Sequence, residues 1–441
     1  MMLRFIAVFA LVGALAFLPA CVTDPVTGKT SIGIDRTDDE EVTMAAPHAA
    51  SFKAQYEGAY PDPEIQRYCE RIVLGLTKDS PRHALPWNFT ILNSSDVNAF
   101  ALPGGTVCIT RGLLWQLGSE AEFAGVMGHE VGHVDHKHSA KGEGRATIFN
   151  ILLLGAGVAA ESSDSDWARA GVIGFGVAGQ LTMLHYSRDQ ELESDRRGIY
   201  YAYEAGYDPR ELANVFELFK RLKGGGGGPS WLSSHPMDDD RIAQVNKLVA
   251  REYPNLASRR LTVSTPEWNR LMTRLRADQR IYERYDEAAV SFAEAIKSGN
   301  DGAMPRILDE LRACERERPK HAIFTSATGV VQMRMGRTSE AKSAFQRAAA
   351  LQPDLFEPHI YLAQIAFDRG ERSTVIREAE AAAKIFPNHP SPYYLAARTY
   401  DSAGQTQQAV THYQSVVQRA PEESEQYRYS YQRLQALGVI R

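Results

Sequence analysis

The 441-residue sequence predicts an α+β fold that is mostly helical, in which a domain with a small β-sheet is followed by an α-solenoid. Three observations predict it: a helix-spaced His-Glu-x-x-His motif, a strand-turn-strand pattern before it, and prolines and glycines that recur near the end of the chain. At this length we expect two or three domains. A hydrophobic content of 44% allows a sizeable core, and a net charge of −5 with interspersed signs gives no case for nucleic-acid binding.

The first motif, HEVGH, occupies residues 129–133 and has the spacing of a metal site. Because His129 and His133 are four residues apart, both rings lie on one face of a helix and can reach one ion. Glu130 would stand beside that ion, where it can take a proton from water. Ser119 and Glu122 have the spacing of a capping box, which supports a helix here. The alternative is a helix that carries two unrelated histidines.

A catalytic zinc needs three protein ligands and one open position, so a third donor must lie downstream. The acidic stretch at residues 187–195 offers Glu191 and Asp195, again four residues apart and on one helical face. One carboxylate can bind the metal while the other accepts the free ring N–H of a ligand histidine. The alternative is a charged, solvated helix face.

HEVGH followed by SRDQELESD resembles the gluzincin metalloproteases of the CAAX-prenyl-protease and HtpX-like family. The resemblance implies a Zn2+ cofactor held by His129, His133 and Glu191. It also implies that Glu130 is the general base and that Asp195 supports a ligand histidine.

Four residues near these motifs carry smaller expectations. Ser194 stands where the family usually has alanine, a change that should not disturb the metal. Lys137-His138 matches a basic-His pair that often follows the motif in relatives. His136 and His138 could suggest extra metal binding, but we interpret them as exposed histidines near the C-terminal end of the helix dipole.

A strand-turn-strand pattern precedes the HEVGH helix. Residues 98–105 read as a strand entering a turn, and residues 106–110 continue as a second strand. In relatives this segment pairs with an extended peptide, so the resemblance implies that Asn98, Ala99 and Phe100 bind substrate by β-augmentation. An ordinary structural hairpin is the alternative.

A late His-Pro element, with Arg241 six residues after His235, also resembles the family. The resemblance implies that both side chains approach the oxyanion of the tetrahedral intermediate and stabilise it. Five glycines at residues 224–228 predict a mobile linker just upstream, which suggests a gate. His235 could then fill the fourth coordination position and keep the enzyme latent. In the other interpretation, His235 only caps the next helix.

Residues 1–20 have the pattern of a secretory signal, and residues 18–21 resemble a bacterial lipobox. This predicts a lipid-modified Cys21 and a place in the cell envelope, on the periplasmic side, as an outer-membrane lipoprotein. The alternative is simple cleavage and a soluble periplasmic product. Cys69 and Cys108 could pair, or they could be buried free thiols like Cys314.

The C-terminal part contains an internal repeat of 34 residues, marked by two ladders of four residues: Pro319, Pro353, Pro387, Pro421, and Gly336, Gly370, Gly404, Gly438. This period, with proline closing a helix pair and glycine in its turn, is the tetratricopeptide pattern. We expect three units and a terminal helix from about Ser424.

The predicted domains are a signal peptide (1–20), a lipidated linker (21–49), a zinc metalloprotease domain (50–252), a helical linker or degenerate repeat (253–318) and tetratricopeptide repeats (319–441). Two apolar stretches, 147–160 and 170–184, are expected to be packed helices.

The architecture as a whole resembles BepA-like periplasmic metalloproteases. This resemblance implies a membrane-anchored zinc endopeptidase in the quality control or assembly of envelope and outer-membrane proteins. Expected partners are unfolded or misassembled protein substrates, a protein docked on the repeats, and the membrane through the lipid anchor. The alternative is a chaperone or scaffold that acts mainly through its repeats, with a latent, His-gated protease site.

Overall fold

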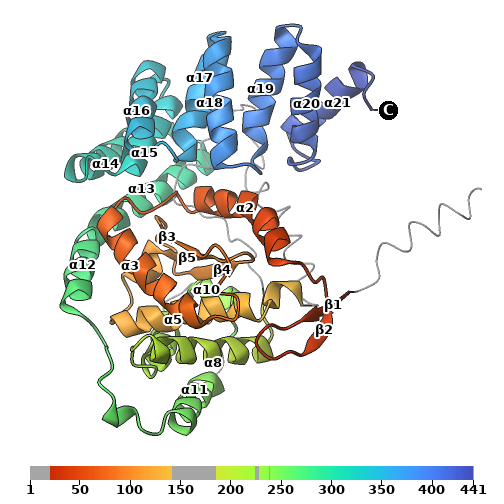
Figure 1. Ribbon diagram of the computed structural model, residues 1–441. Helices are drawn as coiled ribbons and strands as arrows, with labels where there is room; N and C mark the ends of the chain where they lie inside the picture. Colours follow the sequence, from red (N-terminus) through yellow and green to blue (C-terminus); the bar gives the residue numbers. More distant parts are fainter. Residues whose placement is uncertain (1–19, 142–184, 224–227, 238, 441) are drawn as a thin grey trace, which may run out of the picture.

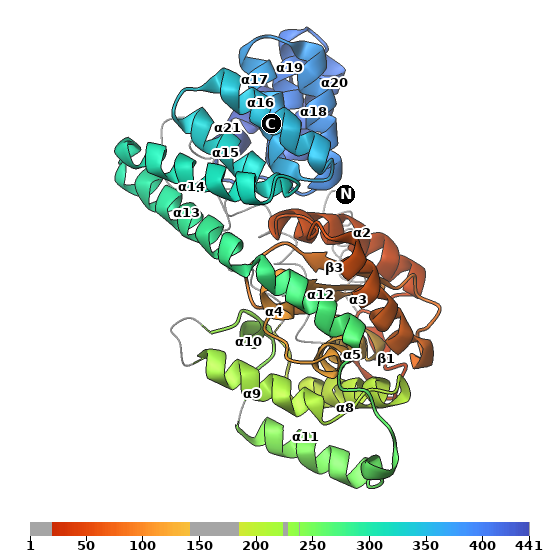
Figure 2. The ribbon, with the colours of Figure 1, turned by 90° about the vertical axis from the view of Figure 1, so that its left-hand side faces the viewer.

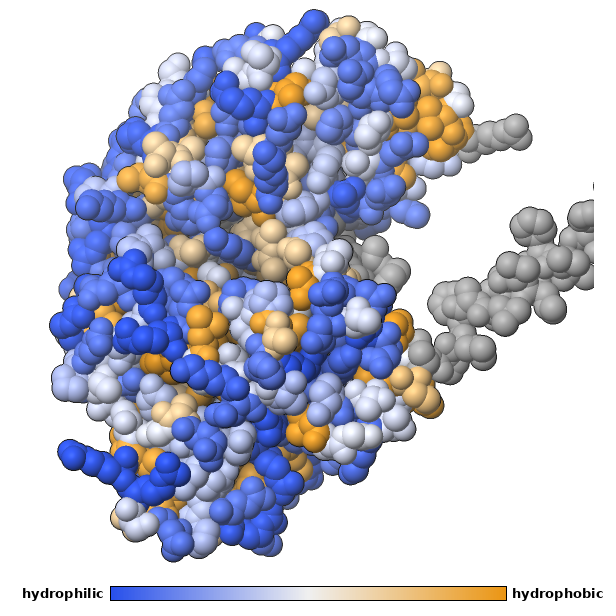
Figure 3. All heavy atoms as spheres, in the orientation of Figure 1, coloured by the Kyte–Doolittle hydropathy of each residue, from blue (hydrophilic) through white to orange (hydrophobic). Residues whose placement is uncertain are grey.

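The computed structural model describes residues 20–141, 185–223, 228–237 and 239–440. Apart from Ala20, the predicted signal peptide lies outside these residues, as do the two apolar stretches and most of the glycine run. A lower body contains the sheets, and an upper body is a stack of helices (Figure 1). The surface shown in Figure 3 is mainly hydrophilic, with scattered hydrophobic residues. Within the described ranges, no helix combines the length and apolar character that crossing a bilayer requires.

The lower body is built around a three-stranded sheet with the order β3-β5-β4. β3 runs parallel to β5, and β4 pairs with β5 antiparallel, so that β4 forms one edge. A separate hairpin of β1 and β2 carries the N-terminal residues. The elements of this body are β1 (Ala20–Thr23), β2 (Thr30–Gly33), α2 (Asp38–Gln55), α3 (Pro63–Leu76), β3 (Asn88–Leu92), β4 (Ala99–Leu102), β5 (Thr106–Thr110), α4 (Arg111–Leu114), α5 (Glu120–Asp135), α8 (Arg188–Glu204), α9 (Glu211–Lys223), α10 (Trp231–Ser234) and α11 (Asp239–Glu252).

Helices α5 and α8 carry the two metal motifs and lie against each other with close backbones. Each begins at a serine: Ser119 accepts from the N–H of Glu122, and Ser187 forms a full capping box with Gln190. Glycines line the contact, and a Cβ added at Gly198 of α8 would lie only 2.8 Å from the backbone nitrogen of His129. The missing side chains let the two motifs face each other across a short gap.

The upper body contains three helix pairs and a final helix, as the repeat predicts: α15 (Ala322–Arg334), α16 (Thr338–Leu351), α17 (Phe356–Asp368), α18 (Arg372–Ile385), α19 (Pro390–Ser402), α20 (Thr406–Val417) and α21 (Glu425–Ala436). The glycine ladder occupies the turns after α15, α17, α19 and α21, each glycine with φ of 71° or 72°. This left-handed conformation favours glycine, which explains the ladder. Ser424 caps the last helix, where the sequence predicted its start.

Three helices connect the two bodies: α12 (Pro266–Ala277), α13 (Gln279–Ser298) and α14 (Met304–Glu317). The first two run from the lower body to the upper one (Figure 2). At the joint, the buried Arg111 lies 3.5 Å from the centre of the Tyr282 ring, and Tyr285 donates to Glu57. Lys53 of α2 pairs with Asp354 of the repeats at 2.5 Å. The repeats are therefore docked on the lower body.

Candidate metal centre

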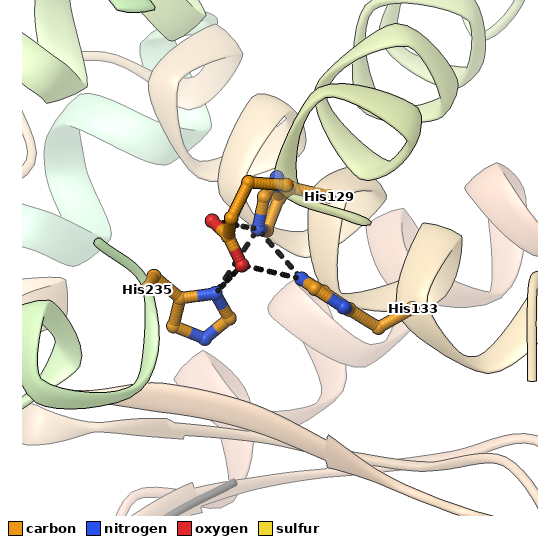
Figure 4. Close-up of side chains that lie close together, drawn as sticks. His129, His133 and His235 are labelled. Atoms are coloured by element: carbon orange, nitrogen blue, oxygen red, sulfur yellow. Dashed lines mark hydrogen bonds and ion pairs between the residues drawn. The ribbon is translucent and has the colours of Figure 1, made fainter. Parts of the chain in front are cut away.

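Four side chains from three separate segments converge beneath the sheet: His129 and His133 from α5, Glu191 from α8, and His235 just after α10. Each is at most 3% exposed. Their candidate ligand atoms all lie within 4.8 Å of one another. Figure 4 shows the three histidine rings turned toward one point. These are the residues that could hold a metal ion.

The two motif histidines point their Nε2 atoms at each other, 3.0 Å apart. His129 donates its Nδ1–H to Asp195 Oδ1 at 2.8 Å, so Nε2 is the ring nitrogen that remains to bind a metal. Glu191 adds a carboxylate: Oε1 lies 3.4 Å from His133 Nε2, and Oε2 lies 3.6 Å from His129 Nε2. Electron-rich atoms gathered in a dry site repel one another unless a cation lies among them. The donor set therefore fits a divalent metal.

Arg241 organises the two acidic residues of α8. Its Nε and Nη2 donate to the two oxygens of Asp195, each at 2.8 Å, and its Nη1 lies 2.6 Å from Glu191 Oε2. Its guanidinium group also lies over the Phe216 ring. Sequence reasoning expected Arg241 near a reaction oxyanion. The structure places its guanidinium group against Asp195, which bonds a candidate ligand histidine, and against Glu191, a candidate metal ligand. The oxyanion role stays a prediction.

Glu130 lies beside the cluster and is 1% exposed. The indole Nε1–H of Trp231 donates to its Oε1 at 3.0 Å, and His235 Nε2 lies 3.6 Å from the same oxygen. Burial raises the pKa of Glu130, although His235 and His129 act against this. A carboxyl group whose pKa is raised toward neutrality is suited to exchange protons. Sequence reasoning missed Trp231, because no motif marks it.

The pKa values of the other cluster members follow from burial and neighbouring charge. Burial lowers the pKa of His133 well below its ordinary value, which keeps the ring neutral. For Glu191, burial acts to raise the pKa, but His235 and Arg241 bring it well below the ordinary value. Glu191 is therefore ionised and His133 neutral, as metal ligands must be.

His235 is held in place by the short helix α10. Its ring stacks on Trp231 with centroids 4.3 Å apart, and its Nδ1 lies 2.9 Å from Glu191 Oε1 and 3.3 Å from His129 Nε2. The backbone N–H of Trp231 donates to Val97 O, two residues before the edge strand β4. The segment thus lies between the metal cluster and the sheet edge.

A model of peptidase family M48 matches residues 62–249, which include HEVGH, Glu191, Asp195 and His235. Residues 62–249 form an M48-type peptidase domain. A tetratricopeptide repeat model matches residues 393–423, in the third helix pair and the turn after it.

Three relatives of this chain have the names of peptidases. Mitochondrial metalloendopeptidase OMA1 of Arabidopsis thaliana is 35% identical over 179 residues, which cover 38% of this chain and 35% of the plant protein. Beta-barrel assembly-enhancing protease of Yersinia pestis is 22% identical over 395 residues, covering 85% of this chain and 80% of that protein. The Escherichia coli K12 protein of the same name is 27% identical over 238 residues, covering 52% of this chain and 48% of its own length. The chain thus spans about a third to a half of two of these relatives.

Among solved structures, a crystal structure of MamA is similar at 17% identity and a TM-score of 0.29, covering 33% of this chain and 85% of MamA.

The structure brings the predicted site residues of α5 and α8 together with His235 and Arg241. Asn98, just before β4, and Ala99 and Phe100, its first two residues, lie elsewhere and are at most 6% exposed. Asn98 donates to Tyr56 Oη at 3.0 Å. A peptide could therefore meet the main chain of this strand but not these side chains, and their role in substrate binding stays a prediction.

The structure corrects the expectation for His136 and His138 and decides between the two alternatives for the cysteines. His136 and His138 were expected to be exposed, but they are 2% and 1% exposed, because the N-terminal hairpin covers this end of α5. Cys69, Cys108 and Cys314 are buried free thiols.

Proposed function

We propose that this chain is a zinc endopeptidase that cuts unfolded or misassembled proteins of the cell envelope. The observation that carries the proposal is the meeting of His129, His133 and Glu191 in one dry cluster, with Glu130 beside it. Two imidazoles and one carboxylate are the ligand set of several zinc peptidases. The M48 match over the same residues supports this reaction class.

Glu130 performs the proton transfers in the proposed reaction. Zinc bound at the cluster would polarise the scissile carbonyl and lower the pKa of a water molecule. Glu130 takes a proton from the attacking water as that water forms its bond to the carbonyl carbon. When the C–N bond breaks, Glu130 delivers the proton to the leaving amine. Trp231 holds the carboxylate in position through its indole N–H.

The substrate is proposed to bind as an extended strand along β4, the edge strand of the sheet. Main-chain hydrogen bonds at a sheet edge accept many sequences, which suits unfolded proteins. Asn98, Ala99 and Phe100 would contribute backbone groups. A strand added there would meet the α10 segment, which already bonds Val97 O.

The cellular setting is proposed from the N-terminus and the relatives. Cys21 is exposed at the start of the β1–β2 hairpin, where a lipid could be attached. Two of the relatives are named beta-barrel assembly-enhancing protease. We therefore place the chain at the periplasmic side of the outer membrane, in the quality control or assembly of envelope proteins. The repeats would bind a protein partner.

The position of His235 favours a second candidate function. With His235 Nδ1 in the cluster, four protein side chains surround the metal position, as in a closed structural site. A catalytic site keeps one position open. In this candidate the chain acts mainly as a chaperone or scaffold through its repeats, and its protease site is latent until α10 moves.

The test of the proposed function is Glu130→Gln in the full chain. We expect the variant to bind one zinc per chain, as the wild type does, and to lose casein cleavage. Glu204→Gln, at an exposed position of α8, is the matched control and should cleave normally. Full cleavage by Glu130→Gln, or a wild type without zinc, would overturn the proposal.

A further inference from the structure

The chain makes an unusual turn directly after the helix that carries HEVGH. α5 ends at Asp135, and Lys137 takes a left-handed conformation with φ 51° and ψ 40°. A residue with a Cβ rarely adopts it unless its surroundings enforce it. Here Lys137 Nζ donates to Asp35 Oδ1 at 2.9 Å and to Arg36 O at 2.7 Å. The turn brings His138 back against α5.

His138 then contacts a metal-cluster residue from behind. Its Nδ1 lies 2.9 Å from Nδ1 of His133, the ring nitrogen that faces away from the cluster. Its Nε2 lies 3.1 Å from Glu193 Oε2, on α8. Ser194 Oγ is a more distant neighbour of His138 Nδ1 at 3.4 Å. The His138 ring is buried, while the Glu193 side chain is 37% exposed.

One arrangement of protons satisfies both contacts. If His133 Nδ1–H donates to His138 Nδ1, then His138 carries its proton on Nε2 and donates it to the Glu193 carboxylate. His133 Nε2 is left with a lone pair that faces the cluster. The reverse arrangement would put a proton on His133 Nε2 and leave His138 Nε2 facing a carboxylate without a proton between them. Glu193 therefore favours the tautomer of His133 that can bind a metal.

We propose that His138 and Glu193 are positioning residues that hold His133 in its metal-binding tautomer. The proposal rests on the proposed zinc function and deepens it. His129 obtains the same support from Asp195 and Arg241. The two ligand histidines are thus oriented by different means. A charged pair orients His129, and a neutral ring that is hydrogen-bonded to a carboxylate orients His133.

A second metal ion at His136, His138 and Glu193 is the competing explanation of this cluster. The structure favours hydrogen bonding instead, because a cation is already present. Lys141 Nζ lies 2.7 Å from Asp24 Oδ2 and 3.9 Å from Glu193 Oε2. Asp24 also pairs with His136 Nδ1 at 2.8 Å. The lysine supplies the positive charge that a second ion would bring.

The test measures zinc affinity of the full chain by competition with a chromophoric chelator. His138→Phe removes the acceptor and should weaken zinc binding about 10- to 100-fold. His138→Asn places an acceptor oxygen near the position of Nδ1 and should recover most of that loss. Ser194→Ala, beside the same ring, is the matched control and should bind zinc like the wild type.

A second measurement covers the case in which His138→Phe does not fold. Glu193→Gln changes a partly exposed residue, and its amide can donate to His138, which permits the wrong tautomer. We expect weaker zinc binding and, in 15N-histidine NMR of the metal-free protein, a mixture of His133 tautomers where the wild type has Nδ1–H. The NMR result tests the inference even if the wild type proves to bind no zinc.

Three results would overturn the inference: wild-type affinity in His138→Phe, no recovery in His138→Asn, or an unchanged His133 tautomer in Glu193→Gln. Two zinc ions per wild-type chain, falling to one in His136→Ala, would also overturn it, because Glu193 would then be a ligand.

Discussion

His235 Nδ1 lies 2.9 Å from Glu191 Oε1, which places a fourth donor in the metal cluster. The contact depends on α10, since the His235 ring stacks on Trp231 and the Trp231 backbone is bonded to Val97. A side chain in that position competes with substrate for the open coordination site that catalysis needs. We therefore predict that His235 restrains the reaction while it occupies this position.

The first prediction follows from this contact. His235→Ala should raise casein cleavage roughly tenfold or more if the closed form predominates, because the active fraction sets the observed rate. Zinc content should stay near one per chain, since His129, His133 and Glu191 remain. His185→Ala, at an exposed histidine that contacts Ser233, is the control and should leave the rate unchanged. A marked fall in His235→Ala would show that His235 assists the reaction instead.

Much of this arrangement follows from local sequence patterns. Helical spacing alone puts His129 and His133 on one face, and the same spacing pairs Glu191 with Asp195. Glycines at a fixed interval predict turns between helices, and each of the four lies in a turn and has a positive φ. Such features can be read from sequence because each depends on residues close together in the chain.

Contacts between distant segments could not be read in this way. Trp231 reaches Glu130 across 101 positions, and Asp24 reaches His136 across 112. His136 and His138 looked like exposed helix-end residues because nothing near them in sequence shows that the N-terminal hairpin covers them. The glycine run before α10 predicted a moving segment but not its docking on Val97.

The second prediction concerns Trp231. Trp231→Phe keeps an aromatic ring beside His235 but removes the N–H that donates to Glu130. A buried carboxylate that loses a donor costs about 1–3 kcal/mol, so we expect kcat to fall about 5- to 100-fold. Zinc stoichiometry should be unchanged. To separate this effect from release of His235, the substitution should be measured in the His235→Ala background; an unchanged kcat there would contradict the role of the indole.

The third prediction concerns metal removal. The cluster gathers a carboxylate and ring lone pairs in a dry site, so the folded lower body should bind zinc far better than the unfolded chain does. Chelation should lower the stability of that body by about 3 kcal/mol when zinc had been present at about 100 times its Kd. Calorimetry would detect this as a lower Tm, restored by zinc. The chelator should have no effect on Glu191→Ala, and an unchanged wild-type Tm after verified zinc loss would count against the site.

The fourth prediction concerns pH and the repeats. Glu357 begins the first turn of α17 at 6% exposure, and burial, reinforced by the charge of Glu57, raises its pKa to about 8 from an ordinary 4.5. The folded state therefore binds the Glu357 proton more tightly than the unfolded state does. The stabilisation from this proton is complete below pH 4.5 and is lost as the pH rises through about 8.

Glu357→Gln is neutral at every pH and should avoid that loss. Its free energy of unfolding should exceed that of the wild type by on the order of 2–4 kcal/mol at pH 8.5, and the two should be equal near pH 4.5. Urea unfolding followed by circular dichroism measures this difference. Glu423→Gln changes an exposed glutamate and serves as the control. An advantage that does not depend on pH would mean that packing, not ionisation, is responsible.

The fifth prediction concerns Gly198, which lies where α8 contacts α5. A Cβ there would lie 2.8 Å from the backbone nitrogen of His129 and 3.1 Å from Gly125 O, neither of which can move without moving α5. Gly198→Ala should therefore separate α5 from α8, destabilise the lower body by about 1–3 kcal/mol and weaken zinc binding. Gly75→Ala on α3, where a Cβ meets nothing within 4 Å, is the matched control and should be neutral or stabilising. Because Glu191 and Asp195 are on α8 while their histidine partners are on α5, zinc affinity should fall together with stability. A Gly198→Ala protein with wild-type zinc affinity would show that the glycine contact does not set the distance between the two motifs.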